Sequence, residues 1–390
     1  MRAILAAAAL VCALNAAPAV AQTSPLIVEK KVFELPSYTT EGGQTIKNVR
    51  IGWESYGTLN ADKSNAILIT HFFSATSHAA GKYAASDAVP GYWDAIIGPG
   101  KAIDTDKYFV LSSDTLVNLN ANTPNVVTTG PASVNPDTGK PYGLSFPIVT
   151  IRDMVGVQKA LVDTLGIKKL RAVVGASMGG LQAFEWAVNY PDAIERIVPV
   201  ISAAGGDAFL TAWLDVWGQP IKLDPKWNGG DYYGREAPNA GLAGALKVVS
   251  LHANQADWAN ATFGLAPAAP AKAPGAAMDN QFKIEAALEA GGKARAAGAD
   301  ANHFLYLVKA NQLAAADPAK VKVPTLLVSS PNDLVFPPAW VERTAGAIAA
   351  NGTKVQRASV AGPNGHLNGV LHINQAGPAI AEFLARPLTN

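Results

Sequence analysis

Cysteine is nearly absent from this chain of 390 residues, which contains Cys12 and no other. A single cysteine excludes an internal disulfide scaffold, a cysteine-ligated zinc site and an iron–sulfur cluster. An excess of one charge is missing too, because 31 basic residues stand against 30 acidic ones. This balance gives no indication of nucleic acid or an anionic membrane as a partner. No H-E-x-x-H motif or similar spacing of histidines and carboxylates occurs, so we expect neither a metal nor a cofactor.

Long apolar runs are lacking except at the N-terminus, where residues 1–21 have the pattern of an export signal. Arg2 supplies the positive end, residues 3–14 are apolar, and the A-V-A triplet ending at Ala21 is a small-x-small cleavage site. The apolar run is too short to span about 30 Å of bilayer at about 1.5 Å per residue. We therefore predict cleavage after Ala21, which leaves 390 less 21, or 369, residues in a periplasmic or secreted protein. A lipid anchor on Cys12 is the alternative.

The chain after residue 21 alternates between short β-branched runs and helical periods, the pattern of a mostly parallel sheet covered by helices. The predicted strands span residues 49–56, 66–72, 108–112, 171–175, 196–200, 325–329 and 355–360. The clearest predicted helix spans residues 151–165. Thr150 can cap it, with Asp153 three residues further on, and its apolar side chains share one face.

One long segment does not fit this alternation. Residues 203–318 have a helix-forming, alanine-rich composition and lie between two predicted strands. We predict that they form a helical cap over one edge of the sheet. The chain then divides into a signal (1–21), the first part of an α/β core (22–202), the cap (203–318) and the second part of the core (319–390).

The most informative motif is G-x-S-x-G, which places Ser177 between an apolar run and a helix that starts at Met178. Gly175 and Gly179 flank the serine, which fits a corner where strand and helix approach too closely for a Cβ atom. Such a corner forces the serine into strained backbone angles, exposes its Oγ and aims the first helix amides at it. The alternative interpretation is a glycine-rich corner without chemistry.

A serine nucleophile needs an imidazole to take its proton and a carboxylate to hold that imidazole. Asp333 follows directly after the predicted strand 325–329, and two histidines, His366 and His372, come later in the chain. The order Ser, Asp, His is the order of the α/β-hydrolase fold. We favour His366 as the base because glycines bracket its loop, whereas His372 lies in an apolar run typical of a packed histidine.

Two backbone amides are the predicted oxyanion donors. One belongs to Met178, next to the nucleophile, and the other to Phe73 in the loop HFFSATSH that comes after an early strand. His71 and His78 border this loop and are expected to shape it. We expect the rings of Phe72 and Phe73 to line the acyl side of the pocket.

With these residues identified, the chain resembles the homoserine O-acetyltransferases of the α/β-hydrolase superfamily over residues 31–383. The similar blocks include WESYGTLNADKSNAILITH, PGYWDAIIGPGKAIDTDKYFVLSS, TGPASVNPDTGKPYGLSFPIVTIRDMV, GASMGGLQAFEWA, DPKWNGGDYYG, DANHFLYL and NDLVFPP. The resemblance implies Ser177 as nucleophile, Asp333 and His366 as its partners, and a helical cap that forms a tunnel to the serine. It also implies a homodimer joined through the caps.

The departures from this family lie where the substrate is recognised. Residues 118–127, NLNANTPNVV, replace a glycine-rich run, HFFSA replaces H-A-L-T-G, and HLNG replaces H-D-A-F after the triad histidine. An arginine that lines the family's tunnel corresponds to Leu246, with Lys247 beside it. An apolar side chain cannot replace a guanidinium that pairs with a carboxylate.

The export signal and the lost arginine favour an exported serine esterase that acts on small or medium carboxylic esters, since acetyl-CoA is a cytosolic metabolite. The alternative is a homoserine O-acetyltransferase or related O-acyltransferase that uses acetyl-CoA. A catalytically silent binding protein is a third interpretation, which the complete set of Ser177, Asp333 and His366 disfavours.

Overall fold

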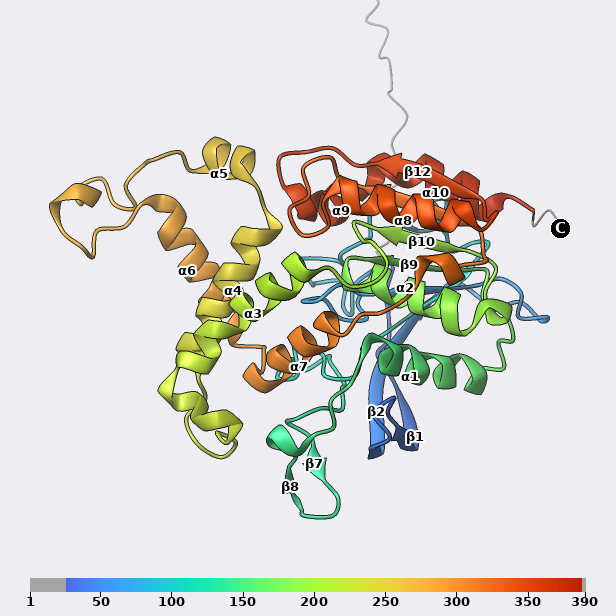
Figure 1. Ribbon diagram of the computed structural model, residues 1–390, viewed down its shortest axis with the longest axis horizontal. Coiled ribbons are helices and arrows are strands. Elements are labelled where there is room, and N and C mark those ends of the chain that lie inside the picture. The colour runs from blue at the N-terminus through green and yellow to red at the C-terminus, as the bar shows by residue number, and fades with distance from the viewer. Residues whose placement is uncertain (1–25, 388–390) are drawn as a thin grey trace, which may run out of the picture.

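A central sheet of eight strands organises the computed structural model, which describes residues 26–387 (Figure 1). In spatial order its strands are β1 (Lys31–Thr39), β2 (Thr45–Tyr56), β6 (Phe109–Ser113), β3 (Ala66–Thr70), β9 (Ala172–Ala176), β10 (Ile197–Val200), β11 (Thr325–Ser329) and β12 (Val355–Ser359). The pairs β1–β2 and β2–β6 are antiparallel, and every pair from β6 to β12 is parallel. The predicted export signal lies outside the described residues.

The strands match the apolar runs closely. All residues of β3, β9 and β10 are buried, as expected for parallel strands covered on both faces. All seven predicted strands are present, although β2 begins four residues before the expected start and β3 ends two residues before the expected end. Strand β1 was not predicted. Only one of its nine residues is buried, so its sequence has no apolar run like those of the central strands.

Helices cover both faces of the sheet and divide the core into two apolar clusters. On one face lie α1 (Ile151–Thr164), α2 (Met178–Asn189) and α8 (Pro338–Ala350), and on the other lies α10 (Gly377–Ala385), with the short α9 (Asn368–Leu371) before it in the chain. The predicted cap of α1 is confirmed, because Thr150 and Asp153 form a capping box. Two pairs of very short strands stand apart from the sheet: β4 (Ile97–Gly98) with β5 (Ile103–Asp104), and β7 (Val134–Asn135) with β8 (Lys140–Pro141).

The segment between β10 and β11 is helical and extends to one side of the sheet, as the yellow-green to orange helices of Figure 1 show. Its helices are α3 (Ala208–Leu223), α4 (Asn239–Ala253), α5 (Ala256–Thr262), α6 (Lys283–Ala296) and α7 (Ala301–Gln312). All five lie within the segment expected to form the cap. Within residues 26–387, none of the helices has the length and apolar character needed to cross a bilayer.

Candidate active site

Ser177 occupies a strained corner between β9, which ends at Ala176, and α2, which begins at Met178. Its φ of 55° and ψ of −119° fall in a region that residues with a Cβ atom rarely adopt. The predicted reason for the flanking glycines is confirmed. A Cβ added to Gly175 or to Gly179 would lie 2.0 Å from an atom of Thr70 at the end of β3. The tight packing of β3 against this corner therefore holds the serine in its unusual conformation.

The three predicted catalytic side chains, which are far apart in the sequence, meet at this corner. The His366 Nε2 atom lies 2.8 Å from the Ser177 Oγ, and the His366 Nδ1 atom lies 2.8 Å from Oδ2 of Asp333. Each residue comes after the carboxyl end of a parallel strand, so the topology brings them to the same edge of the sheet. The geometry selects His366 over His372, which instead ends the short helix α9.

The environment of Asp333 fixes the direction of proton transfer. Its Oδ1 accepts hydrogen bonds from the backbone N–H groups of Val335 (2.8 Å) and Phe336 (2.9 Å), which leaves Oδ2 for the imidazole. An ionised carboxylate only accepts, so the ring proton resides on Nδ1 of His366 and Nε2 can accept from the serine hydroxyl. Exposures of 9% for Ser177, 6% for His366 and 3% for Asp333 show that little water reaches the three groups.

Asn368 is a buried residue of the site that the sequence analysis missed. Its side chain donates to Ser330 Oγ (3.0 Å) and to the Gly362 carbonyl (3.0 Å), and its Oδ1 accepts from the Asn364 N–H (3.1 Å). These bonds join the loop after β11 to the loop after β12, which carry the acid and the base. The sequence offered one indication of this role, since Asn368 is a polar residue two positions after His366 in the HLNG segment.

The two amides expected to bind an oxyanion lie on the segments that flank the serine. Met178 is the first residue of α2, where backbone N–H groups have no partner within the helix. Phe73 lies in the loop after β3. Among residues 26–387, neither amide donates a hydrogen bond, so both remain free to bind a ligand. Their role as oxyanion donors remains a prediction.

The expectation for the two phenylalanine rings was half wrong. The Phe73 ring packs edge-on against Trp217 of α3 and Phe304 of α7, with centroid distances of 5.4 and 5.2 Å. Phe72 instead contacts Tyr92 and joins the apolar cluster on the other face of the sheet. A turn begins here, since the Phe72 carbonyl accepts from the Ala75 N–H at 3.0 Å, and of the two rings only that of Phe73 packs toward α3 and α7.

The histidines that border this loop act as hydrogen-bonding supports. The His71 Nδ1 atom lies 2.8 Å from the Phe72 carbonyl, and Asn118 contacts its Nε2 at 3.2 Å. Burial lowers the pKa of His71, which keeps its ring neutral. The Nδ1 atom of His78 lies 3.0 Å from Oε2 of Glu54, a fully buried carboxylate.

The position that corresponds to the family's tunnel arginine is fully buried. Leu246 has 0% exposure and belongs to the larger apolar cluster, which includes side chains of α3, α4 and α7. Lys247 lies on the side of α4 that faces α6, where its charge acts on Glu289. Neither side chain supplies a cation next to the serine.

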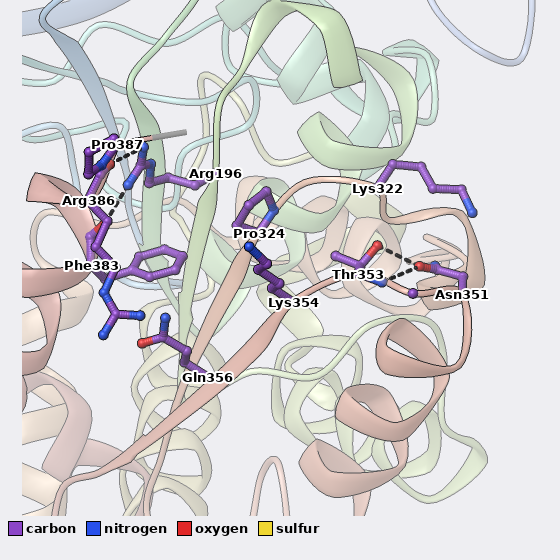
Figure 2. A pocket seen from close by; sticks show the side chains of 11 residues that line it. Arg196, Lys322, Pro324, Asn351, Thr353, Lys354, Gln356, Phe383, Arg386 and Pro387 are labelled. Carbon is purple, nitrogen blue, oxygen red and sulfur yellow. Dashed lines mark hydrogen bonds between the residues drawn. The ribbon is translucent and has the colours of Figure 1, made fainter. Parts of the chain in front are cut away.

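A large cavity lies at the opposite edge of the sheet. Its volume is about 620 Å³ and its walls come from the segments that precede β10, β11 and β12, including Arg196, Lys322 and Lys354 (Figure 2). Since these three strands are parallel, this cavity and the serine are at opposite strand ends. Within the described residues, no group of three or more histidine, cysteine or acidic side chains could hold a metal ion.

Comparisons with known proteins agree with the fold. The family described as alpha/beta hydrolase fold matches residues 123–370. A homoserine O-acetyltransferase of Methanosphaerula palustris is 40% identical over 356 residues, which cover 89% of this chain and 71% of the relative.

Two solved structures are similar over nearly their whole length. The crystal structure of esterase E22 is 48% identical, with a TM-score of 0.88, and covers 92% of this chain and 100% of its own. The crystal structure of homoserine O-acetyltransferase from Bacillus anthracis is 36% identical, with a TM-score of 0.89, and covers 94% of this chain and 100% of its own. This pair therefore includes one esterase and one acetyltransferase.

Proposed function

Because this chain belongs to the homoserine O-acetyltransferase family of α/β hydrolases, we propose that it is an enzyme that takes an acyl group onto Ser177. The observation that carries this proposal is the line of 2.8 Å contacts from Ser177 through His366 to Asp333. It contains the nucleophile, the base and the orienting carboxylate in the order that acyl transfer requires.

The first half of the reaction is derived from this geometry. The Ser177 Oγ attacks the carbonyl carbon of an ester or thioester while His366 Nε2 takes the hydroxyl proton. The amides of Met178 and Phe73 would stabilise the oxyanion, an interaction typically worth about 2.7–4 kcal/mol for one donor. His366 then donates the proton to the leaving alcohol or thiol, and the acyl group remains bound to the serine.

The second half depends on which molecule accepts the acyl group. The names of the curated relatives favour homoserine and therefore transfer from acetyl-CoA. Two observations favour water and therefore ester hydrolysis. Leu246 is buried where the resemblance calls for a carboxylate-binding arginine, and the chain is 48% identical to an esterase. On these grounds we propose a serine esterase for small carboxylic esters, with homoserine O-acetyl transfer as the second candidate.

One experiment separates the two candidates. Purified protein is assayed for release of p-nitrophenol from short-chain esters, and in parallel for release of CoA from acetyl-CoA with and without homoserine. Ester turnover that exceeds homoserine-dependent CoA release supports the esterase, and the reverse establishes the transferase. Both activities should disappear in Ser177→Ala, and activity that survives would remove the nucleophile assignment.

Export is a separate proposal, supported by the N-terminal pattern that ends at Ala21. Expression of the full chain in a bacterium with an outer membrane, with subsequent fractionation and N-terminal sequencing, tests it. A mature N-terminus at Gln22 in the periplasm or medium is expected. Full-length protein in the cytoplasm would contradict it.

A homodimer joined through the cap is also proposed. Apolar side chains are exposed along α3, namely Phe209 (68%), Val216 (46%) and Leu223 (77%), and a groove of about 580 Å³ lies between α3 and α7. Contiguous exposed apolar surface is typical of an interface. Light scattering after size-exclusion chromatography should give twice the mass of one chain, and Phe209→Asp should shift the mass toward one chain.

A further inference from the structure

The C-terminal end of cap helix α4 touches both loops that carry the partners of Ser177. His252 lies in the last turn of this helix and Asn254 is its C-cap residue. Both are buried, with exposures of 7% and 5%. The first reaches the loop after β11, which holds Asp333, and the second reaches the loop after β12, which holds His366.

His252 is held in a single orientation by its neighbours. The indole N–H of Trp217 donates to its Nδ1 at 3.2 Å, and the Trp213 ring stacks on it with a centroid distance of 4.2 Å and an interplanar angle of 20°. Because an indole can only donate, the ring proton of neutral His252 resides on Nε2. His252 and Leu334, the residue next to Asp333, line the same small cavity, and the Leu334 backbone acts on the imidazole to raise its pKa.

Asn254 makes the corresponding contact to the other loop. Its Oδ1 accepts from the Asn364 side chain at 3.1 Å, and its own amide group is anchored by the Ser250 carbonyl at 2.9 Å. A Cβ on Gly365 would lie 3.4 Å from the carbonyl carbon of Asn254, so the helix end packs closely against the residue before His366.

These contacts act on the reacting groups through the backbone. Both oxygens of Asp333 depend on its loop, since Oδ1 is bound by the amides of Val335 and Phe336 and Oδ2 faces His366. A shift of the loop at Leu334 would therefore change the distance between carboxylate and imidazole. We propose that His252 and Asn254 are positioning residues through which the cap aligns Asp333 and His366 with Ser177; this rests on the proposed function.

The charge state of His252 fits this role. Burial, and next the nearby charge of His366, lower its pKa to about 4, while Asp333 acts in the opposite direction. The other charged groups that line the cavity beside it, about 210 Å³ in volume, are Asp207 and Arg343, which face each other at 3.8 Å. A neutral His252 can accept from Trp217, whereas a protonated ring would lose this acceptor.

The experiment compares three cap variants with the wild type. His252→Phe keeps the ring stacking and removes both polar ring nitrogens, His252→Gln retains one acceptor and one donor, and Asn254→Ala removes the contact with Asn364. Tyr306→Phe is the matched control, because its hydroxyl ties α7 to the Phe146 carbonyl (2.6 Å), away from both catalytic loops. The readouts are covalent labelling of Ser177 by a fluorophosphonate probe, kcat and KM for p-nitrophenyl acetate, and the melting temperature.

We expect His252→Phe to slow labelling and kcat by up to about 100-fold with KM nearly unchanged, as for a displacement of about 1 Å in a reacting group. His252→Gln should recover most of this loss, Asn254→Ala should lose less than His252→Phe, and Tyr306→Phe should react at the wild-type rate. The proposal is overturned if His252→Phe is labelled at the wild-type rate, or if Gln fails to rescue it. Absence of labelling in the wild type would instead overturn the proposed function itself.

Discussion

Polar side chains at the amino ends of the parallel strands make different contacts from those at the carboxyl ends. At the amino ends of β9 and β10, Arg171 and Arg196 donate to the backbone carbonyls at the end of α10, with Arg171 Nη2 at 2.8 Å from Leu384 O and Arg196 Nη2 at 3.0 Å from Arg386 O. At the carboxyl ends, a hydroxyl, an imidazole and a carboxylate contact one another instead. Backbone carbonyls only hold the arginine side chains in place, whereas the hydroxyl, imidazole and carboxylate groups at the carboxyl ends can exchange protons.

The comparison shows that the volume of a cavity does not identify the reactive edge. The cavity of about 620 Å³ in Figure 2 lies at the amino ends of the strands, where Arg196 donates to the Arg386 carbonyl. Ser177 has only 9% exposure, yet it combines a strained backbone with a base at 2.8 Å. Backbone strain and titratable groups in contact are therefore the better signals of function.

The largest expected effect is on activity at the carboxyl edge. His366→Gln removes the base that activates Ser177, so the kcat for ester hydrolysis should fall by about 10⁴-fold or more, as in other serine triads. His372→Gln is the matched control, since His372 lies outside the contact line and should retain its rate. Equal losses in the two variants would contradict the choice of His366.

The next effect is on stability at the amino edge. Arg196→Met removes the donor to the buried Phe383 carbonyl and one of the two donors to the Arg386 carbonyl, which Arg171 still reaches. A buried group without a partner costs about 1–3 kcal/mol, so the free energy of unfolding should fall by about 1–3 kcal/mol in denaturant titrations. The kcat of the folded variant should be unchanged, because the contact line of Ser177 is not disturbed. Lys322→Met on the exposed rim of the same cavity should have no effect on unfolding.

A third effect is the pH dependence of stability near the Phe73 loop. Burial raises the pKa of Glu54, but hydrogen bonds from His78 and Tyr83 and the charge of Lys30 outweigh this and lower it to about 2, below the ordinary 4.5. A carboxyl group with a lowered pKa stabilises the fold above its unfolded value, and this stabilisation is lost as the pH falls from about 4.5 toward 2. The melting temperature of Glu54→Gln should therefore fall less steeply over this range than that of the wild type.

Glu34→Gln is the control for this comparison. Glu34 pairs with Arg50 at 3.0 Å, but its side chain is 69% exposed, so solvent screens the interaction. Its melting curve should match the wild type at every pH. A wild-type curve that is as flat as that of Glu54→Gln would contradict the assigned role of Glu54.

Much of the fold was predictable, because most of its strands are short apolar runs and α1 begins at a clear capping box. Thr150 marked the start of α1, and Ser177 marked the corner before α2. Strand β1 escaped notice because it lies at the sheet edge, pairs only with β2 and buries little of its surface. The alternation of apolar and polar residues that predicts a strand is weak when both faces of a hairpin contact water.

The site was predictable where residue type and chain order define the chemistry. Ser177, Asp333 and His366 obey that rule, and the structure brings them together. Asn368 and His252 do not obey it, because their importance depends on contacts between segments far apart in the chain. Such contacts arise from tertiary packing, which a local pattern does not encode.

The smallest effect compares two adjacent phenylalanines that the structure places on opposite faces of the sheet. Phe73 packs under the cap against Trp217, whereas Phe72 packs against Tyr92 in the other cluster. Phe73→Ala should enlarge the acyl side of the site and shift the kcat/KM ratio of p-nitrophenyl octanoate to acetate by about tenfold, the scale of a few methylene contacts. Phe72→Ala should lower the melting temperature by removing core contacts and leave this ratio unchanged. If both variants shift the ratio alike, the loop as a whole has moved and Phe73 does not line the acyl pocket.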